Sequence, residues 1–480
     1  MNTIKKLFTT NVGMKNQLTT GPMRPQKYPF NATWVLAFVL LGAMGFQNCR
    51  QDQADESPEY RLATDLAIEW NYFALELERN TMGFRPPVGA RMFAHVEMAA
   101  YEASLPALQG YKSLETILQG YIPPPASFGP GQFYLPSSLN AAYAQILRDF
   151  FPTAPDFLKR KIDQLEETHH EKFLQQAQEQ AVRASAAFGK NVAQTVWAWS
   201  KTDREGHDAH LYNYDQGYEP LSCDGCWKPT GDHPKPALLP YWGRVRPFYT
   251  QVSEVPIRPP VAYQPDPGSE FYTEAMEVFS VTSPLSKENL WIAEFWSDDL
   301  PGLTLTPAGR WISIASQAFE QARPPFPLVI ETYLKTALAL NDAGIISWHG
   351  KYEFNVERPE TYIRERIDPD WRVLHETPSF PAYPSGHAAF GASAAVVLSE
   401  ALGAKFELTD RTHEKRPEFA STPRNYGSFM EMARENAASR VFLGVHFRMD
   451  CKEGLRLGKI IGKKTADLEL VRKEAAMVKR

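Results

Sequence analysis

Hydrophobic residues recur every three or four positions along most of this chain, which is the spacing of an amphipathic helix. In residues 57–80 the pattern is carried by Leu62, Leu66, Trp70, Phe73 and Leu77. The same period predicts further helices at residues 88–105, 140–151, 156–200, 270–281, 288–296, 307–322, 326–348 and 388–402. We expect the long 156–200 helix to break near Phe188–Gly189. No stretch alternates as a strand would, so the predicted fold class is all-α.

Residues 202–268 interrupt the helical pattern, being rich in Pro, Gly, Tyr and Asp. So long an irregular segment is often a functional loop or lid, and its role here stays open. We therefore predict an N-terminal helical region over residues 57–322, with an irregular excursion at 202–268. A C-terminal helical bundle is predicted over residues 323–480.

The first 49 residues are typical of an export signal. Basic residues at positions 5, 6, 15, 24 and 27 precede an apolar run at 34–46, which is short for a membrane span. Cys49 stands where a lipoprotein signal would be modified, although the three residues before it fit that pattern poorly. Lipidation of Cys49, simple cleavage and an uncleaved single anchor all remain open. Export would place the protein in the periplasm or cell envelope.

The amino-acid composition limits which partners the protein can bind and indicates the state of its cysteines. Of 480 residues, 43% are hydrophobic, enough for a substantial core, and the net charge of -5 gives no basic footprint for nucleic acid. No later segment reaches 18 uninterrupted apolar residues, which argues against several membrane spans. Cys223 and Cys226 predict a local disulfide in an exported protein, because no second pair completes a zinc site. Cys451 is expected to be a buried free thiol.

Two stretches offer groups that bind oxyanions. Lys351 and Arg358 lie seven apart, and Pro359 disfavours helical geometry at Arg358, which should project from a turn. The alternative is an ordinary charged helix end. Pro384 should begin the next helix, whose free N–H groups, with Ser385 and Gly386, favour an anion. Ser385 could also act only as a helix cap, and His387 in the first turn could exchange a proton with a ligand.

The third stretch runs from Ser439 to Asp450. Arg440 and His446 are six apart, so the chain should turn near Gly444 for both to face one ligand. Asp450 lies four residues after His446 and can accept a hydrogen bond from one imidazole nitrogen, leaving the other free to attack or ligate. The alternative is a surface ion pair of Asp450 with Arg448 or Lys452.

The order of these three motifs resembles the type 2 phosphatidic acid phosphatase and vanadium haloperoxidase superfamily, over about residues 341–454. A looser likeness to bacterial haloperoxidase-like proteins extends to residues 86–104 and 226–248. The resemblance implies packed helix bundles of the vanadium chloroperoxidase type. It also implies an oxyanion, vanadate or phosphate, bound by Lys351, Arg358, Ser385, Gly386, Arg440 and His446.

The two branches of the superfamily imply different chemistry at His446. In a haloperoxidase His446 is the protein ligand of the vanadium, Lys351 withdraws charge from the bound oxidant, and hydrogen peroxide converts halide to hypohalous acid. In an acid phosphatase His446 attacks phosphorus, giving a phosphohistidine, and His387 protonates the leaving oxygen of the phosphate ester. A third hypothesis is a non-catalytic envelope lipoprotein that binds phosphate.

Residues outside the shared motifs favour the peroxidase branch. Trp348 and Phe380 look like the aromatic residues that chloride-oxidising members carry beside the halide, although core packing explains either one alone. The length left after residue 49 also exceeds that of the small acid phosphatases. The sequence therefore favours a vanadate-dependent haloperoxidase as the function of this protein.

Overall fold

The computed structural model describes residues 57–231, 234–300, 302–414 and 422–472. The expected signal segment and Cys49 lie outside these residues. The α-helices are α2 (Pro58–Asn80), α3 (Pro86–Ser104), α4 (Leu135–Phe150), α5 (Asp156–Gln176), α6 (Glu179–Ser200), α7 (Arg204–His207), α8 (Glu270–Thr282), α9 (Lys287–Phe295), α10 (Pro307–Ala322), α11 (Phe326–Phe354), α12 (Pro359–Arg366), α13 (Gly386–Leu402), α14 (Phe429–Phe442) and α15 (Arg448–Ala466). The all-α prediction is confirmed.

The strands in the described residues are short and form two antiparallel pairs. One pair joins β1 (Tyr214–Asp215) to β2 (Ala237–Leu238), and the other joins β3 (Leu408–Asp410) to β4 (Arg424–Tyr426). Four 3-10 helices also connect the larger elements: η1 (Leu105–Ala107), η2 (Leu114–Thr116), η3 (Trp242–Arg244) and η4 (Val252–Glu254). The predicted excursion at residues 202–268 is accordingly irregular along most of its length.

The break in the long 156–200 helix was predicted at the wrong place. The chain breaks between α5 and α6, at Ala177 and Gln178, and Gly189 lies inside α6. A Cβ atom at Gly189 would lie 2.0 Å from the backbone oxygen of Ser138 in α4. Gly189 therefore serves the close packing of two helices and does not end one.

Helices α11 and α13 lie inside the bundle because their sequences are apolar nearly all round. Helix α13 reads GHAAFGASAAVVLSEAL and packs against α10, α11, α14 and α15, while α11 also contacts α2 and α3. Helix α11 thus joins the predicted C-terminal bundle to the N-terminal helices. The domain boundary near residue 323 stays a prediction. In the described part of the chain, none of the helices is both long and apolar enough to cross a bilayer.

A stripe of glycines brings α15 close to α13. Cβ atoms added to Gly454, Gly458 and Gly462 would lie 2.3–2.4 Å from backbone oxygens of α13 or of its cap Ser385. Their spacing of four places them on one face of α15. The glycine stripe fixes the start of α13 against the start of α15. Both helix starts carry predicted site residues.

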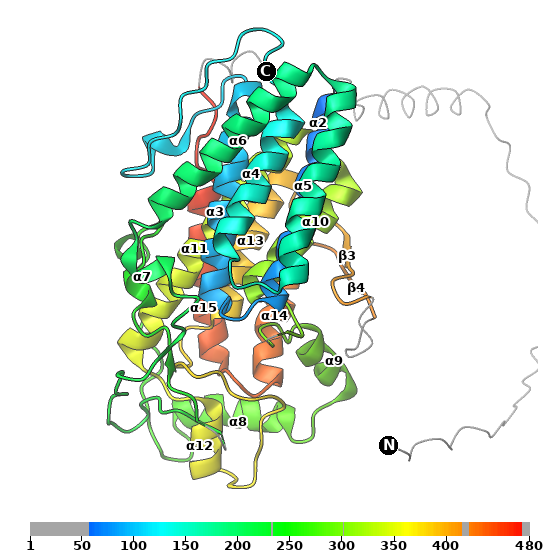
Figure 1. Ribbon diagram of the computed structural model, residues 1–480. Coiled ribbons are helices and arrows are strands. Elements are labelled where there is room, and N and C mark those ends of the chain that lie inside the picture. Colours follow the sequence, from blue (N-terminus) through cyan, green and yellow to red (C-terminus); the bar gives the residue numbers. More distant parts are fainter. Residues whose placement is uncertain (1–56, 232–233, 301, 415–421, 473–480) are drawn as a thin grey trace, which may run out of the picture. The chain divides into compact units, whose positions relative to one another are not determined.

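Short helices gather at one end of this bundle. Figure 1 shows α8 and α12 together beyond the ends of α14 and α15, and α8 contacts α12, α14 and α15. The last turn of α11, the first turn of α13 and the α14–α15 connection carry the three motifs.

Candidate functional site

Helix α11 continues past its predicted end and carries Lys351 in its last turn. The Lys351 side chain is fully buried, and its ammonium donates to the backbone oxygens of Pro381 (2.9 Å) and Ala382 (3.0 Å). One helical turn earlier, Trp348 packs against Phe380 with ring centroids 4.9 Å apart. The Lys351 nitrogen lies 4.9 Å from the centre of the Phe380 ring. The two aromatic candidates therefore form one wall beside this cation.

Arg358 precedes α12 and lies outside both helices, as predicted, but it projects from extended backbone and not from a turn. Pro359 is the first residue of α12, and Arg358 itself is the extended N-cap. Its Nε donates to the backbone oxygen of Phe380 at 2.8 Å, and its Nη1 donates to that of Val445 at 2.6 Å. Nη1 also lies 3.3 Å from Nε2 of His446. Arg358 thus links the 380 segment to the third motif.

The second motif forms the start of α13, with one correction to the prediction. Pro384 is not the first helical residue, because the helix begins at Gly386 and Ser385 is its N-cap. The Ser385 hydroxyl accepts from the amide of Ala388 at 3.4 Å, so the capping role proposed for it is present. The N–H groups of the first turn are oriented as an anion would require. His387 stands in that turn.

The third motif turns as predicted. Helix α14 ends at Phe442, Gly444 takes a φ of 81°, and α15 starts at Arg448. A Cβ at Gly444 would also meet the Trp371 ring at 2.8 Å, so glycine is required on two grounds. The turn brings the side chains of Arg440 and His446 to one cavity.

Asp450 fixes the orientation of the His446 ring. Its Oδ2 lies 2.9 Å from Nδ1 of His446 and accepts from the amide of Phe447 at 2.9 Å. With Nδ1 donating to the carboxylate, Nε2 presents its lone pair toward Arg358 and the cavity. Asp450 is therefore not in a surface ion pair with Arg448, which instead pairs with Glu277.

A cavity of about 380 Å³ reaches these residues. Its wall includes Trp348, Phe380, Gly386, His387, Arg440 and His446. Lys351, Arg358, Ser385 and Asp450 are buried directly behind that wall through the contacts above. The structure thus brings all ten predicted site residues together.

The electrostatics of the site show an excess of buried positive charge. Burial, reinforced by Arg358, lowers the pKa of Lys351 well below its usual value, and burial lowers that of Arg358 to about 9. Burial also lowers the pKa of Arg440 to about 10. The pKa values of His387 and His446 fall well below the usual range, first through burial and then through the neighbouring cations. Both imidazoles are therefore neutral near pH 7 in the free protein.

The donors fit a bound oxyanion. Three of the ten predicted site residues have a buried nitrogen atom without a hydrogen-bond partner within the protein: Nη2 of Arg358, Nε of Arg440 and Nε2 of His387. Leaving such groups unpaired costs free energy, which an anion accepting from the two guanidinium groups, and from His387 once it is protonated, would recover. A compact oxyanion such as vanadate or phosphate would be held by the two guanidinium groups and the first turn of α13, next to Nε2 of His446.

Sequence reasoning missed an acidic part of the same cavity. Asp298 and Asp299 line it, and Arg440 donates from Nη1 to the backbone oxygen of Trp296 at 2.9 Å. Burial raises the pKa of Asp298 to about 7, opposed by Arg310 and Arg440. These aspartates follow α9, about 140 residues before Arg440, and no periodic pattern or motif surrounds them. Their sequence gives no signal for the site.

Comparisons with known proteins find similar chains. Residues 331–472 match the family model described as the VCPO second helical-bundle domain. The vanadium chloroperoxidase of Curvularia inaequalis is 34% identical over 161 residues, covering 24% of this chain and 26% of that protein. The match thus spans about a quarter of the length of this curated relative.

Two solved structures extend the likeness to the N-terminal helices. The first bacterial vanadium-dependent iodoperoxidase superposes with a TM-score of 0.75 at 27% identity, covering 86% of this chain and 98% of that one. A holo bacterial vanadium-dependent chloroperoxidase superposes with a TM-score of 0.61 at 17% identity, covering 81% and 93%, and shows the fold alone. The predicted helical architecture is confirmed.

Proposed function

We propose that this enzyme, whose C-terminal helices identify it with the vanadium haloperoxidase superfamily, oxidises halide ions with hydrogen peroxide when vanadate is bound. One observation carries the proposal: Arg358, Arg440 and His387 each have a buried, unpartnered nitrogen atom at or directly behind the wall of the cavity that His446 also lines. The aromatic wall of Trp348 and Phe380 beside them favours halide oxidation over ester hydrolysis.

Bound vanadate would supply the centre at which hydrogen peroxide is activated for two-electron oxidation of the halide. Nε2 of His446 would hold it as the single protein ligand to the metal, and Asp450 would keep that nitrogen free of a proton. Arg358 and Arg440 would neutralise charge on the oxygens. Lys351, held by two carbonyl oxygens, would carry its charge behind the same wall once a bound anion raises its pKa again.

His387 is the residue placed to move a proton. Oxidation of halide by peroxide to hypohalous acid and water consumes one proton. His387 lies on the cavity wall, and its Nε2 is unpartnered. A neutral imidazole there can take a proton from hydrogen peroxide as it binds and return it to the leaving oxygen.

The experiment compares two activities of the purified full chain. Iodide and bromide oxidation is measured with hydrogen peroxide, with and without added vanadate, and nitrophenyl phosphate hydrolysis is measured without vanadate. We expect halide oxidation that requires vanadate and is lost in His446→Ala. Hydrolysis without any halide oxidation would replace this proposal with the phosphatase that works through phospho-His446. Phosphate binding without either activity would favour the non-catalytic protein.

We also propose export to the periplasm or cell envelope. The support is the Cys223–Cys226 disulfide in the structure, because such bonds persist in oxidising compartments. Mass spectrometry of the mature protein tests it. Cleavage before Ser57 supports export, and an N-terminus that begins at residue 50 or carries lipid at Cys49 distinguishes simple cleavage from anchoring.

A further inference from the structure

A small disulfide-closed loop from the irregular excursion docks on the segment that leads to Arg358. Cys223 and Cys226 are bonded, and the loop pairs with residues 355–357 as a short bridge. The amide of Trp227 donates to the backbone oxygen of Asn355 at 2.6 Å, and the amide of Glu357 donates to that of Gly225 at 2.9 Å. Two backbone hydrogen bonds, made by the residues on either side of Cys226, therefore hold this segment.

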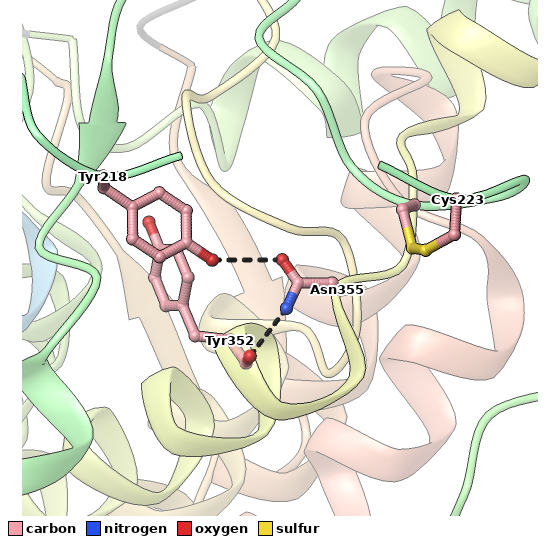
Figure 2. The surroundings of a disulfide bond; sticks show 5 residues. Tyr218, Cys223, Tyr352 and Asn355 are labelled. Atoms are coloured by element: carbon pink, nitrogen blue, oxygen red, sulfur yellow. Dashed lines mark hydrogen bonds between the residues drawn. A yellow bond between two sulfur atoms is a disulfide. The ribbon is translucent and has the colours of Figure 1, made fainter. Parts of the chain in front are cut away.

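Asn355 is held from several directions at once. It takes the left-handed conformation with a φ of 48° directly after α11. Figure 2 shows its side chain between two tyrosines: Nδ2 donates to the backbone oxygen of Tyr352 at 2.6 Å, and Oδ1 accepts from the hydroxyl of Tyr218 at 3.3 Å. Tyr218 belongs to the excursion, so the excursion contacts both the side chain and the backbone of Asn355.

The other edge of the same segment contacts residues 380–382, which include Phe380 of the aromatic wall. The backbone oxygen of Val356 accepts from the amide of Ala382 at 2.9 Å. The backbone oxygens of Phe380, Pro381 and Ala382 in turn hold Arg358 and Lys351. Residues 355–357 thus lie between the disulfide loop on one edge and the acceptors of both cations on the other.

We propose that Asn355 and the disulfide loop of residues 223–227 are positioning elements for Arg358. None of them lines the cavity, so they act on a bound oxyanion only by fixing the backbone from which Arg358 projects. A guanidinium binds an oxyanion well only within about 0.5 Å of its proper place. A disulfide loop with only two residues between its cysteines has little freedom to lose, so it holds that backbone at low entropic cost. This inference rests on the oxyanion site of the proposed function and holds for vanadate or phosphate.

The test measures phosphate and vanadate binding to the full chain by calorimetry. Asn355→Gly keeps the left-handed backbone accessible but removes both side-chain contacts, and Tyr218→Phe removes one hydroxyl with little risk to folding. We expect Asn355→Gly to weaken binding about tenfold, which corresponds to about 1.4 kcal/mol. Lys228→Ala is the matched control, since it removes only the exposed pair of this loop with Glu365.

A double-mutant cycle with Arg358→Ala separates positioning from general destabilisation. Positioning through Arg358 predicts that Asn355→Gly has no further effect once Arg358 is gone. An equal loss of affinity in both backgrounds would overturn the inference. So would unchanged binding in Asn355→Gly and Tyr218→Phe while the wild type binds. If the wild type binds neither oxyanion, both this inference and the proposed function fail. Peroxidase assays of the wild type test the proposed function independently of the binding measurement.

A separate experiment tests the role of the disulfide. It uses phosphate as the ligand because thiols reduce vanadate. Phosphate affinity of wild type treated with dithiothreitol should fall to that of the Cys223→Ser/Cys226→Ser double variant. Dithiothreitol should not change the double variant. Equal phosphate affinity of all four samples would remove the disulfide from the proposal.

Discussion

Nδ1 of His446 lies 2.9 Å from Oδ2 of Asp450, and the two side chains are 3% and 0% exposed. The same carboxylate oxygen accepts the amide of Phe447, so the start of α15 fixes it. The imidazole therefore cannot turn its other nitrogen away from the cavity without breaking a buried, charge-assisted hydrogen bond.

Asp450→Asn should lower oxyanion affinity and halide oxidation about 10- to 100-fold, because an amide orients the imidazole less firmly and removes its charge partner. Isothermal calorimetry and steady-state kinetics measure the two effects. Asp467→Asn, at the exposed far end of α15, should leave both unchanged. Full activity in Asp450→Asn would contradict the assigned role.

Oxyanion binding should strengthen as pH falls. In the free protein, burial and neighbouring cations lower the pKa values of His387, His446 and Lys351, and a bound anion raises them again. Binding then takes up protons, so affinity rises toward low pH. Sulfate is the suitable probe because its charge is constant from about pH 5 to pH 9. A flat affinity profile for sulfate would contradict the prediction.

Phosphate or vanadate should also raise the melting temperature. A ligand at 100 times its Kd stabilises the folded state by about 2.7 kcal/mol. Arg440→Ala should lose most of this gain, because it removes one of the unpartnered donors. Arg434→Ala, an exposed position on the same helix, should keep it. Differential scanning calorimetry with and without ligand makes the comparison.

Glu97→Gln should stabilise the protein near neutral pH. Burial raises the pKa of Glu97 from 4.5 to about 8, opposed only by hydrogen bonds from Asn71 and Tyr143. The folded state therefore holds this proton where the unfolded state releases it. The stabilisation that the protonated Glu97 contributes is fully present below about pH 4.5 and is lost as pH rises toward 8. Urea unfolding from pH 4 to pH 8 should show a flatter profile for Glu97→Gln, whereas the exposed Glu171→Gln should follow the wild type.

Gly458→Ala should destabilise the bundle by about 1–3 kcal/mol, because its Cβ would lie 2.3 Å from the backbone oxygen of Ala389. It should also weaken phosphate binding, since α13 and α15 would separate at the site. Gly217→Ala, where an added Cβ meets only Asp215 at 3.4 Å, is the control. An unchanged denaturation midpoint in Gly458→Ala would refute the proposed role of the glycine stripe.

The fold was largely predictable because helical periodicity is a local signal. The period of three to four located most of the helices, and the motif order, through the family resemblance, brought Lys351, His387 and His446 to one site. Gly189 was misinterpreted because a glycine that permits close helix contact has the same local sequence signature as one that ends a helix. Only the position of Ser138, about 50 residues earlier in the chain, distinguishes them.

The surroundings of the motifs were not predictable from the sequence. Asn355 lies between two recognised cations, yet its importance depends on Tyr218 and Trp227, which approach from the irregular excursion. Asp298 reaches the cavity only through tertiary packing. The glycine stripe at 454, 458 and 462 was visible in the sequence, and its spacing of four could have indicated a close helix contact.

Cys451 follows Asp450 directly and is 2% exposed, and burial raises the pKa of its thiol to about 12. Cysteine sulfur reacts with electrophilic halogen mainly as the thiolate, so burial would protect this side chain if the proposed function yields hypohalous acid. The reactivity of Cys451 toward iodoacetamide therefore reports opening of the α13–α15 contact. A wild-type enzyme that turns over without losing this free thiol has kept α13 and α15 in contact.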